Sequence, residues 1–353
     1  MKVCLLSMKG NFDASIGQGV QRYMYYTWKT LERIQKNYGR LDKVELGIGR
    51  GLPMRKASFT LLSLLHDFSN YDIVHTPAPI MFNPLWRGNA KMITTVHELI
   101  IIDEKSPCTK SVEKDKKPNM MVRAAAGFVG TRIKKQILDS DELIVNSTQT
   151  RDEAVKLGFS KSHINIIKWG LDGRFLKGFT KPPKKFTVGY MGALNARKNI
   201  GFAIRAFKSM EGRDVQFRIY GDGPERDELE RLAVSDSRIE LMGFADEKMH
   251  VSVYDEFSVF VFPSVYEGLC LPILEAQARG LPVIIYKHAN IPKEIRKYCF
   301  EAEDEEHMAQ IIKEIKENGY DERLRMKAAQ NAREYTWENA AKETVEVYRR
   351  ACL

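Results

Sequence analysis

The sequence predicts two successive α/β domains, and three observations predict this class. Its 353 residues exceed the length at which a single hydrophobic core usually keeps growing. Short Val- and Ile-rich runs alternate with longer helix-like stretches, which is typical of parallel sheets covered by helices. This alternation occurs twice, and a segment with Gly, Lys and Pro-Pro at 173–185 separates the two series. Because such a segment continues neither a helix nor a central strand, we place the domain boundary there.

The first series contains several Val- and Ile-rich runs that we expect to be strands, with helical candidates between them. These expected strands cover residues 2–7, 43–48, 72–75, 92–96, 142–146 and 164–167. In the second series, the expected strands cover residues 186–190, 215–220, 238–242, 258–262 and 282–285. Helices are expected near 200–209, 225–234, 246–255 and 271–279. From about 303 to 353 the pattern is helical throughout, and Trp337 and Tyr348 are candidates for anchoring the last helix on another surface.

Composition excludes several classes of protein. Hydrophobic residues make up 44% and charged residues 29% of the chain, as in ordinary soluble proteins. No apolar run approaches the roughly 20 residues that cross a bilayer. The first residues enter a strand-like run without the apolar segment or cleavage site of a secretion signal, so we expect a cytoplasmic protein. The five cysteines stand far apart without a CxxC pair, so we expect plain thiols rather than disulfides or a zinc site.

The net charge of +9 favours an anionic partner, which is a nucleotide, a phospholipid or a nucleic acid. Residues 105–135 hold nine Lys and Arg against two acids and overlap an amphipathic run at 120–138. One interpretation is a solvated basic face; the other is peripheral association with anionic headgroups on the inner face of a membrane, or with an anionic acceptor. A nucleic-acid partner is not expected, because no binding module accompanies this charge.

The stretch FPSVYEGLCLPILEAQARGLPV at 262–283 combines a strand end, a Glu-Gly turn and a helix start. Pro272 fits the first turn of a helix, because the N–H that proline lacks has no partner within the helix there. Gly268 allows a ligand to approach the backbone closely. The N–H groups around Cys270 to Ile273 then point out of the first turn, where unsatisfied donors and the helix dipole favour a phosphate. We therefore predict a diphosphate at this helix start.

Two carboxylates, Glu267 and Glu275, flank that helix start with seven residues between them. Glu267 would face a sugar, and Glu275, one turn into the helix, would face a ribose. The alternative is an ordinary helix with two solvated acids. The whole stretch resembles the signature of glycosyltransferase family 4, a large retaining group of enzymes with the GT-B fold.

This resemblance implies specific roles. Glu267 contacts the donor sugar and Glu275 the ribose, while the diphosphate meets the backbone of the residues between them. These backbone residues are Gly268, Leu269, Cys270 and Leu271. Cys270 departs from the family, in which an aromatic residue often stands at this position.

A second segment, VGYMGALNARKN at 188–199, places Arg197 and Lys198 beside a turn after a strand. Cations of this kind neutralise charge that develops on a leaving nucleotide, whereas the alternative is a solvated surface pair. The resemblance implies that Lys198 binds the donor diphosphate. Because Ala193 stands where relatives often carry an Arg, we predict Arg197 as the second cation.

A third segment, RIYGDGP at 218–224, reads as a strand followed by a turn that starts a helix. By itself this is a generic βα turn. The resemblance implies that the turn lies close to the nucleotide and that the residues after the next strand line the base. The candidates are Gly221, Asp222 and Phe244.

The first half contributes fewer candidates. The segment SIGQGVQRY at 15–23 has Arg22 where the third glycine of a GxGxxG pattern would stand, which disfavours a dinucleotide site. The resemblance implies that the backbone of Gly19 reaches the donor diphosphate and that His97 lies beside the reacting sugar. We interpret His97 as a sugar-hydroxyl or backbone contact; its ordinary pKa would also suit a base, which retention does not require. The alternative for His97 is a structural role.

The resemblance implies an α/β protein with the GT-B fold, in which two Rossmann-like domains face a cleft. Residues 1–175 would bind the acceptor, 186–335 the nucleotide sugar, and 336–353 would form a C-terminal helix that packs on the first domain. The expected reaction is metal-independent and cofactor-free transfer of a hexose from UDP or GDP to a glycan, lipid-linked or small-molecule acceptor. The alternatives are an epimerase or phosphorylase of the same fold and a non-catalytic sugar-nucleotide-binding protein. Trp169 is one further departure, because relatives usually have Asn there.

Overall fold

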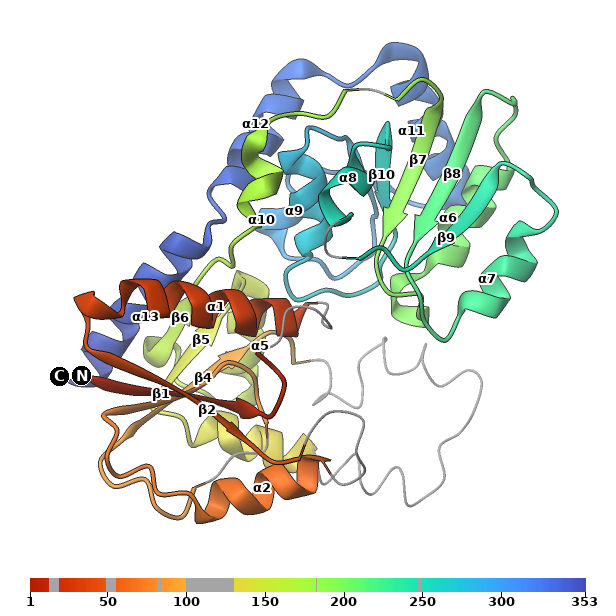
Figure 1. The fold of residues 1–353 in the computed structure, drawn as a ribbon. Helices are drawn as coiled ribbons and strands as arrows, with labels where there is room; N and C mark the ends of the chain where they lie inside the picture. Colours follow the sequence, from red (N-terminus) through yellow and green to blue (C-terminus); the bar gives the residue numbers. More distant parts are fainter. Residues whose placement is uncertain (13–18, 49–54, 81–83, 100–129, 182, 247–248) are drawn as a thin grey trace. The chain divides into compact units, whose positions relative to one another are not determined.

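The computed structural model describes residues 1–12, 19–48, 55–80, 84–99, 130–181, 183–246 and 249–353 (Figure 1). The described residues fall into two compact units. The first unit holds the described residues up to Gly170 together with Thr336–Leu353, and the second holds the described residues of Leu171–Tyr335. Both units are α/β, as predicted, and each is built around a six-stranded sheet whose strands pair in parallel.

The sheet of the first unit has the order β2-β1-β3-β4-β5-β6. Its inner strands are buried along almost their whole length, which explains their Val- and Ile-rich sequences. Figure 1 shows α1 and α2 on opposite faces of this sheet. The strands are β1 (Lys2–Met8), β2 (Arg40–Leu46), β3 (Ile73–Thr76), β4 (Lys91–Val96), β5 (Glu142–Val145) and β6 (Ile164–Ile166). The helices are α1 (Val20–Ile34), η2 (Gln35–Asn37), α2 (Arg55–Leu65), α5 (Thr148–Leu157) and η3 (Lys161–His163).

The sheet of the second unit has the order β12-β11-β10-β7-β8-β9. Helices α6 and α11 pack together on one face of it, and α9 and α12 on the other (Figure 1). The strands are β7 (Phe186–Met191), β8 (Val215–Tyr220), β9 (Ile239–Gly243), β10 (Val259–Phe262), β11 (Val283–Tyr286) and β12 (Phe300–Ala302). The helices are η4 (Gly173–Lys177), η5 (Ala196–Lys198), α6 (Ile200–Lys208), α7 (Arg226–Ala233), α8 (His250–Tyr254), α9 (Leu271–Ala278) and α10 (Lys293–Arg296).

The C-terminal region forms three helices, α11 (Glu305–Asn318), α12 (Glu322–Arg333) and α13 (Trp337–Ala351), rather than one continuous helical run. Each begins at a residue whose side chain accepts a hydrogen bond from the third residue after it. These N-cap residues are Asp304, Asp321 and Thr336. The strand β12, which lies at the edge of the sheet beside β11, was missed in the sequence prediction.

Helix α13 belongs to the first unit, as predicted for the C-terminal helix, and packs against α1. Tyr348 is fully buried, and its hydroxyl lies 2.6 Å from Nδ1 of His75 on β3. The other ring nitrogen of His75 lies 2.8 Å from the hydroxyl of Thr95 on β4. Because a buried polar group without a partner is costly, this chain of hydrogen bonds specifies where α13 docks on the sheet.

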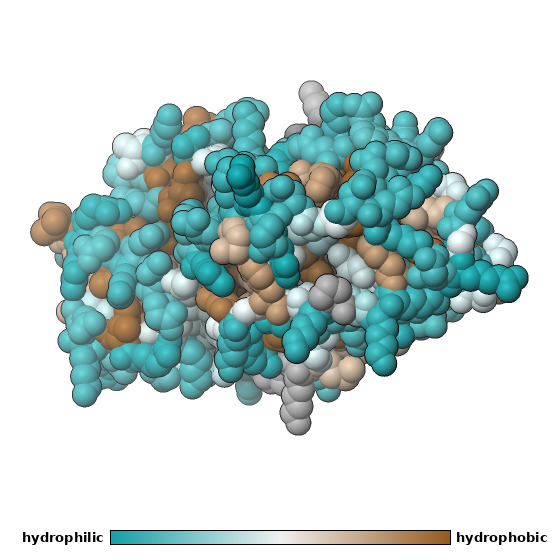
Figure 2. All heavy atoms as spheres, turned by 90° about the horizontal axis from the view of Figure 1, so that it is seen from above, coloured by the Kyte–Doolittle hydropathy of each residue, from teal (hydrophilic) through white to brown (hydrophobic). Residues whose placement is uncertain are grey.

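Hydrophilic side chains prevail on the face that Figure 2 shows, and apolar ones are scattered among them. In the described ranges no helix is long and apolar enough to cross a membrane. Four cysteines lie in the described part, and all of them are free thiols: Cys4, Cys270, Cys299 and Cys352. The basic region 105–135 lies outside the described residues except for 130–135, which are helical.

Candidate functional site

In the sheet of the second unit, the order in which successive strands are added reverses between β7 and β10. Strand order runs from β7 to β8 and β9 on one side and from β10 to β11 and β12 on the other. In open α/β sheets, ligands bind beyond the carboxyl ends of the strands at such a switch point. The loop after β7 carries Lys198, and the loop after β10 carries Glu267. The fold therefore brings two of the predicted site residues to its expected binding position.

Lys198 and Glu267 form a buried ion pair at this switch point. Nζ of Lys198 lies 2.5 Å from Oε1 of Glu267, and their side chains are only 11% and 9% exposed. The hydroxyl of Ser264 donates to the same oxygen at 2.5 Å. The ammonium also lies 4.9 Å from the ring centre of Phe262, which adds a cation–π contact. Lys198 is therefore not the solvated surface cation of the alternative interpretation, and Glu267 is not a solvated acid.

The charges around Glu267 keep its carboxylate ionised. Burial by itself would raise the pKa of Glu267, but the positive charges of Lys198 and Arg197 oppose this. Together with hydrogen bonds from Lys198 and Ser264, they hold the pKa of Glu267 below its ordinary value of 4.5. Arg197 thus contributes charge to this cluster although the sequence ranked it below Lys198.

Backbone hydrogen bonds fix the loop that carries Glu267. The amide of Val265 donates to the carbonyl of Arg197 at 2.9 Å, and the hydroxyl of Ser264 reaches the same carbonyl at 3.2 Å. On the other side, the amide of Glu267 donates to the carbonyl of Asn290 at 2.9 Å. The loops after β7, β10 and β11 are therefore held together, and each positions the Lys198–Glu267 pair. The sequence pattern did not single out Ser264 or Asn290, although Ser264 stands inside the recognised motif.

The start of α9 has an unusual backbone. Cys270, the N-cap residue, adopts a left-handed conformation with φ of 68°, which is uncommon for a residue other than glycine. The amide of Ile273 already donates to the carbonyl of Cys270 at 3.1 Å. The prediction that the N–H groups up to Ile273 point outward was therefore wrong for that residue, and Pro272 has no N–H. The candidate anion donors at this helix start are the amides of 268–271.

Glu275 lies on the next turn of α9 and is 2% exposed. Its Oε2 accepts a hydrogen bond from the hydroxyl of Tyr254 at 2.7 Å and lies 3.1 Å from Nε2 of His250. Both partners come from α8, and the sequence pattern did not single out either of them. The reading of Glu275 as a solvated acid is therefore wrong.

The predicted loop after β8 packs against the loop after β7, and its Gly221 amide donates to the carbonyl of Gly243 at the end of β9 at 2.8 Å. A Cβ added to Gly221 would lie 1.8 Å from the carbonyl oxygen of Gly192, so Gly221 is required for this close approach. The amide of Gly192 in turn donates to the backbone carbonyl of Tyr220 at 3.0 Å. Asp222 is exposed and its carboxylate accepts a hydrogen bond from the next amide. Phe244 is 62% exposed, so its ring is accessible to a ligand such as a base.

Gly19 is the N-cap residue of α1 in the first unit. Its φ of 59° favours glycine, and a Cβ added there would meet no heavy atom within 4 Å. The backbone at Gly19 is therefore approachable. The remainder of this loop, at 13–18, lies outside the described residues.

His97 follows β4 and is 6% exposed. Its Nε2 lies 2.7 Å from the carbonyl oxygen of Pro77, so Nε2 carries the proton and donates. The ring is enclosed by Tyr23 at 4.8 Å and Trp169 at 4.5 Å between ring centres. Burial lowers the pKa of His97 to about 3. Such a weak base is poorly suited to general-base chemistry near neutral pH, which disfavours the base role. The bond to Pro77 is a backbone contact, and the burial of the ring also fits the structural alternative.

Acid is expected to destabilise the first unit through His75 and His97. Burial lowers the pKa of each to about 3, against an ordinary value of 6.5 for a histidine in the unfolded chain. Between these values the unfolded chain binds more protons than the folded chain, so the free energy of unfolding falls as the pH falls. The expected slope is about 1.4 kcal/mol per pH unit for each histidine.

Urea unfolding of the native chain at pH 7, 6 and 5 measures this slope. A His75→Gln variant removes one of the two histidines and is expected to show a shallower decline. The exposed His163, replaced in the same way, is the control, and a decline that is equally steep in all three chains would contradict the assignment.

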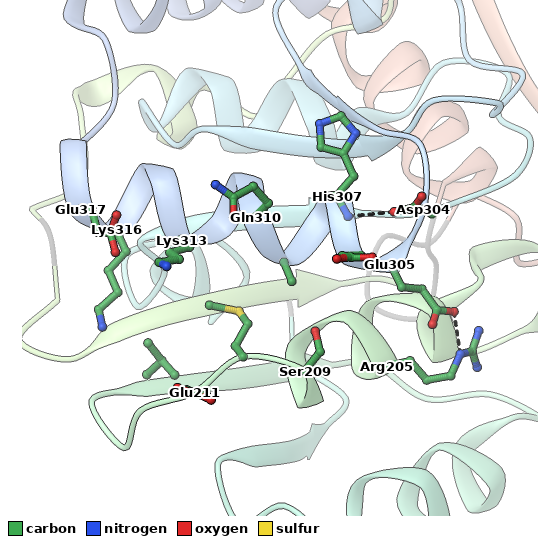
Figure 3. A pocket seen from close by; sticks show the side chains of 14 residues that line it. Arg205, Ser209, Glu211, Asp304, Glu305, His307, Gln310, Lys313, Lys316 and Glu317 are labelled. Atoms are coloured by element: carbon green, nitrogen blue, oxygen red, sulfur yellow. Dashed lines mark hydrogen bonds and ion pairs between the residues drawn. The ribbon is translucent and has the colours of Figure 1, made fainter.

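A groove of about 1010 Å³ lies elsewhere on the second unit, and it contains none of the predicted site residues. Side chains along α11, near the end of α6 and in the segment after α6 line it, and Arg205 pairs with Glu305 within this lining (Figure 3). Its charges are of both signs, and Lys316 in its lining pairs with Asp214 at 2.6 Å. Within the described ranges, no group of three or more His, Cys, Asp or Glu could hold a metal ion.

Family models match both units. The model of glycosyltransferase family 4 matches residues 19–174, and that of the glycosyl transferases group 1 matches residues 185–318. The chain belongs to glycosyltransferase family 4. It is 28% identical to the O-antigen chain mannosyltransferase B of Escherichia coli over 344 residues, which are 89% of this chain and 84% of that protein. It is 25% identical to an uncharacterised glycosyltransferase of Methanocaldococcus jannaschii, over 58% of this chain and 56% of that protein. The chain thus spans only about half the length of that second relative.

Solved structures of glycosyltransferases share the GT-B fold of this family 4 chain. Sucrose-phosphate synthase from Thermosynechococcus elongatus superposes with a TM-score of 0.74 at 18% identity, covering 99% of this chain and 98% of that one. A glycosyltransferase from Rickettsia africae superposes with a TM-score of 0.68 at 15% identity, with the same coverage. At these identities the likeness establishes the fold, and the chain is a glycosyltransferase of the GT-B class.

Proposed function

We propose that this glycosyltransferase transfers a hexose from a UDP- or GDP-linked donor to a glycan, lipid-linked or small-molecule acceptor, with retention of the anomeric configuration. The observation that carries the proposal is the buried cluster of Lys198, Arg197 and Glu267 beside the start of α9. Membership of the family supports the proposal of retention and of a nucleotide-sugar donor. A hexose is supported by two relatives that are mannosyltransferases by name, one of E. coli and one of Mycolicibacterium hassiacum.

In the proposed reaction the bond between the anomeric carbon and the diphosphate oxygen breaks while the acceptor oxygen bonds to the same face of that carbon. The acceptor proton passes to an oxygen of the leaving phosphate. The negative charge that grows on the diphosphate is then stabilised by Lys198, Arg197 and the amides of 268–271. Because these groups supply positive potential, we propose that transfer needs neither a metal ion nor a cofactor.

Glu267 is proposed to hold hydroxyls of the donor sugar. An ionised carboxylate is an acceptor only, so it orients sugar hydroxyls as donors. Because Glu267 is paired with Lys198, the proposed sugar contact and the proposed diphosphate contact lie next to each other and depend on the same ion pair. The proposed contacts of Glu275 with the ribose, of Phe244 with the base, and of Gly19, Gly221 and Asp222 with the donor extend this site.

The experiment that tests the proposal begins with binding. UDP- and GDP-linked hexoses are titrated against the full chain, and the donor that binds is incubated with candidate acceptors, with and without a chelator. We expect transfer to the acceptor, an α-linked product from an α-linked donor by NMR, and unchanged rates with the chelator.

Three other outcomes would each refute part of the proposal. Loss of transfer on chelation would show that a metal is needed. Release of free nucleoside diphosphate with an isomerised sugar, and without an acceptor, would point to the epimerase. Tight donor binding without turnover on any acceptor would point to a non-catalytic binding protein.

A further inference from the structure

Glu275 is held by two side chains of the neighbouring helix α8. Tyr254 and His250 stand four residues apart, one helical turn, so their side chains lie on the same face. The Tyr254 hydroxyl donates to Oε2 of Glu275 at 2.7 Å, and Nε2 of His250 lies 3.1 Å from the same oxygen. The rings of His250 and Tyr254 are stacked, with an interplanar angle of 17°. One carboxylate oxygen is therefore fixed from two directions.

A third ring supports both donors. Phe175 on η4 is fully buried, and its ring meets His250 and Tyr254 edge-on at 5.5 and 5.3 Å between ring centres. This packing restricts the rotation of both rings about their side-chain bonds. The two donors are consequently rigid, so the direction in which the Glu275 carboxylate points is set by α8 rather than by solvent.

Burial makes these donors necessary. The side chain of Glu275 is 2% exposed and that of His250 12% exposed. A buried carboxylate that loses a hydrogen-bond donor bears a desolvation cost, and it relaxes toward another rotamer. A carboxylate that binds a diol through charge-assisted hydrogen bonds is sensitive to such movement, because hydrogen bonds weaken steeply with angle.

We propose that His250 and Tyr254 are positioning residues that orient Glu275 for the ribose hydroxyls of the donor nucleotide. The inference rests on the proposed function, since it takes Glu275 as the ribose-binding carboxylate. His250 acts through Glu275 and does not itself touch the substrate. It therefore governs the affinity for the nucleotide more than the rate of the chemical step.

A cycle that combines a protein variant with a ligand variant tests this. A His250→Leu variant replaces the imidazole with an apolar side chain of similar size and so removes the donor. A His250→Gln variant places an amide N–H at a similar distance from the backbone. Each chain is titrated with UDP, GDP and their 2′,3′-dideoxy counterparts. His250→Leu is expected to weaken the ribonucleotide that binds the native chain about tenfold, but to weaken its dideoxy counterpart by less than about twofold.

The kinetic constants KM and kcat test the same inference independently. For His250→Leu we expect a rise of about tenfold in the KM for the nucleotide sugar with kcat within about threefold of the native value. His250→Gln is expected to restore most of the affinity. The exposed His163, which pairs with Glu142 at 2.8 Å in the first unit, provides the matched control: His163→Leu removes a His–Glu contact without altering nucleotide binding.

The outcomes separate the inference from the proposed function. If the native chain binds neither UDP nor GDP, the proposed function fails and the inference falls with it. If the native chain binds and His250→Leu weakens both nucleotides equally, or neither, only the inference is overturned. Should His250→Leu not fold, as judged by its thermal midpoint, Tyr254→Phe removes the other donor, and the same two comparisons decide the outcome.

Discussion

A Glu267→Gln variant is expected to lose between about a hundredfold and about a thousandfold in kcat, while its affinity for the nucleoside diphosphate changes little. The amide keeps the shape of the side chain and still accepts from Lys198 and Ser264, so the hydrogen bonds that hold this loop are retained. The substitution removes the negative charge. The native side chain carries this charge at neutral pH, because the pKa of Glu267 lies below its ordinary value. Removal of one preorganised electrostatic contact typically has an effect of this size.

Turnover of the nucleotide sugar and binding of the free nucleoside diphosphate are measured side by side for this variant. Glu301→Gln is a matched control, because Glu301 pairs with Arg296 at 2.8 Å on the same unit but away from the switch point. Native turnover by Glu267→Gln would refute the donor-sugar assignment. Equal loss of turnover and nucleotide binding would mean that Glu267 serves the diphosphate cluster alone.

A Lys198→Met variant is expected to lose about a thousandfold in kcat/KM and to be destabilised by about 3–5 kcal/mol. The loss of activity follows because the charge on the leaving diphosphate is no longer neutralised. The loss of stability follows because the carboxylate of Glu267, 9% exposed, is left buried without its cation. Single-turnover assays and urea unfolding measure the two effects.

The double variant Lys198→Met with Glu267→Gln separates these effects. With both charges removed, most of the stability is expected to return, because no unpaired charge is left buried. The double substitution then destabilises the protein by less than the sum of the two single substitutions. Activity is expected to stay low. The exposed Lys161, replaced by Met, serves as the control for a lost cation. Recovery of activity along with stability would show that the pair is structural.

Much of the fold could be predicted from periodicity. The expected strands match the observed ones within a few residues, because parallel strands buried on both faces require continuous apolar runs such as VFVF in β10. The short edge strand β12 lacked such a run and was missed. The break between α11 and α12 was also missed, although the capping residue Asp321 marks it.

The sequence by itself determined the class of the protein and the identity of its main charged candidates, because the motif spacing fixes where each residue stands relative to a strand end. The approach of Lys198 to Glu267 depends on the adjacency of β7 and β10, and strand order is not encoded in any local segment. In the same way, only tertiary structure brought His250 and Tyr254 to Glu275 and buried His97 until its pKa fell to about 3. Burial and hydrogen-bond partners result from packing between segments far apart in the chain. The tertiary structure therefore determines the pKa and the contacts of each of these side chains.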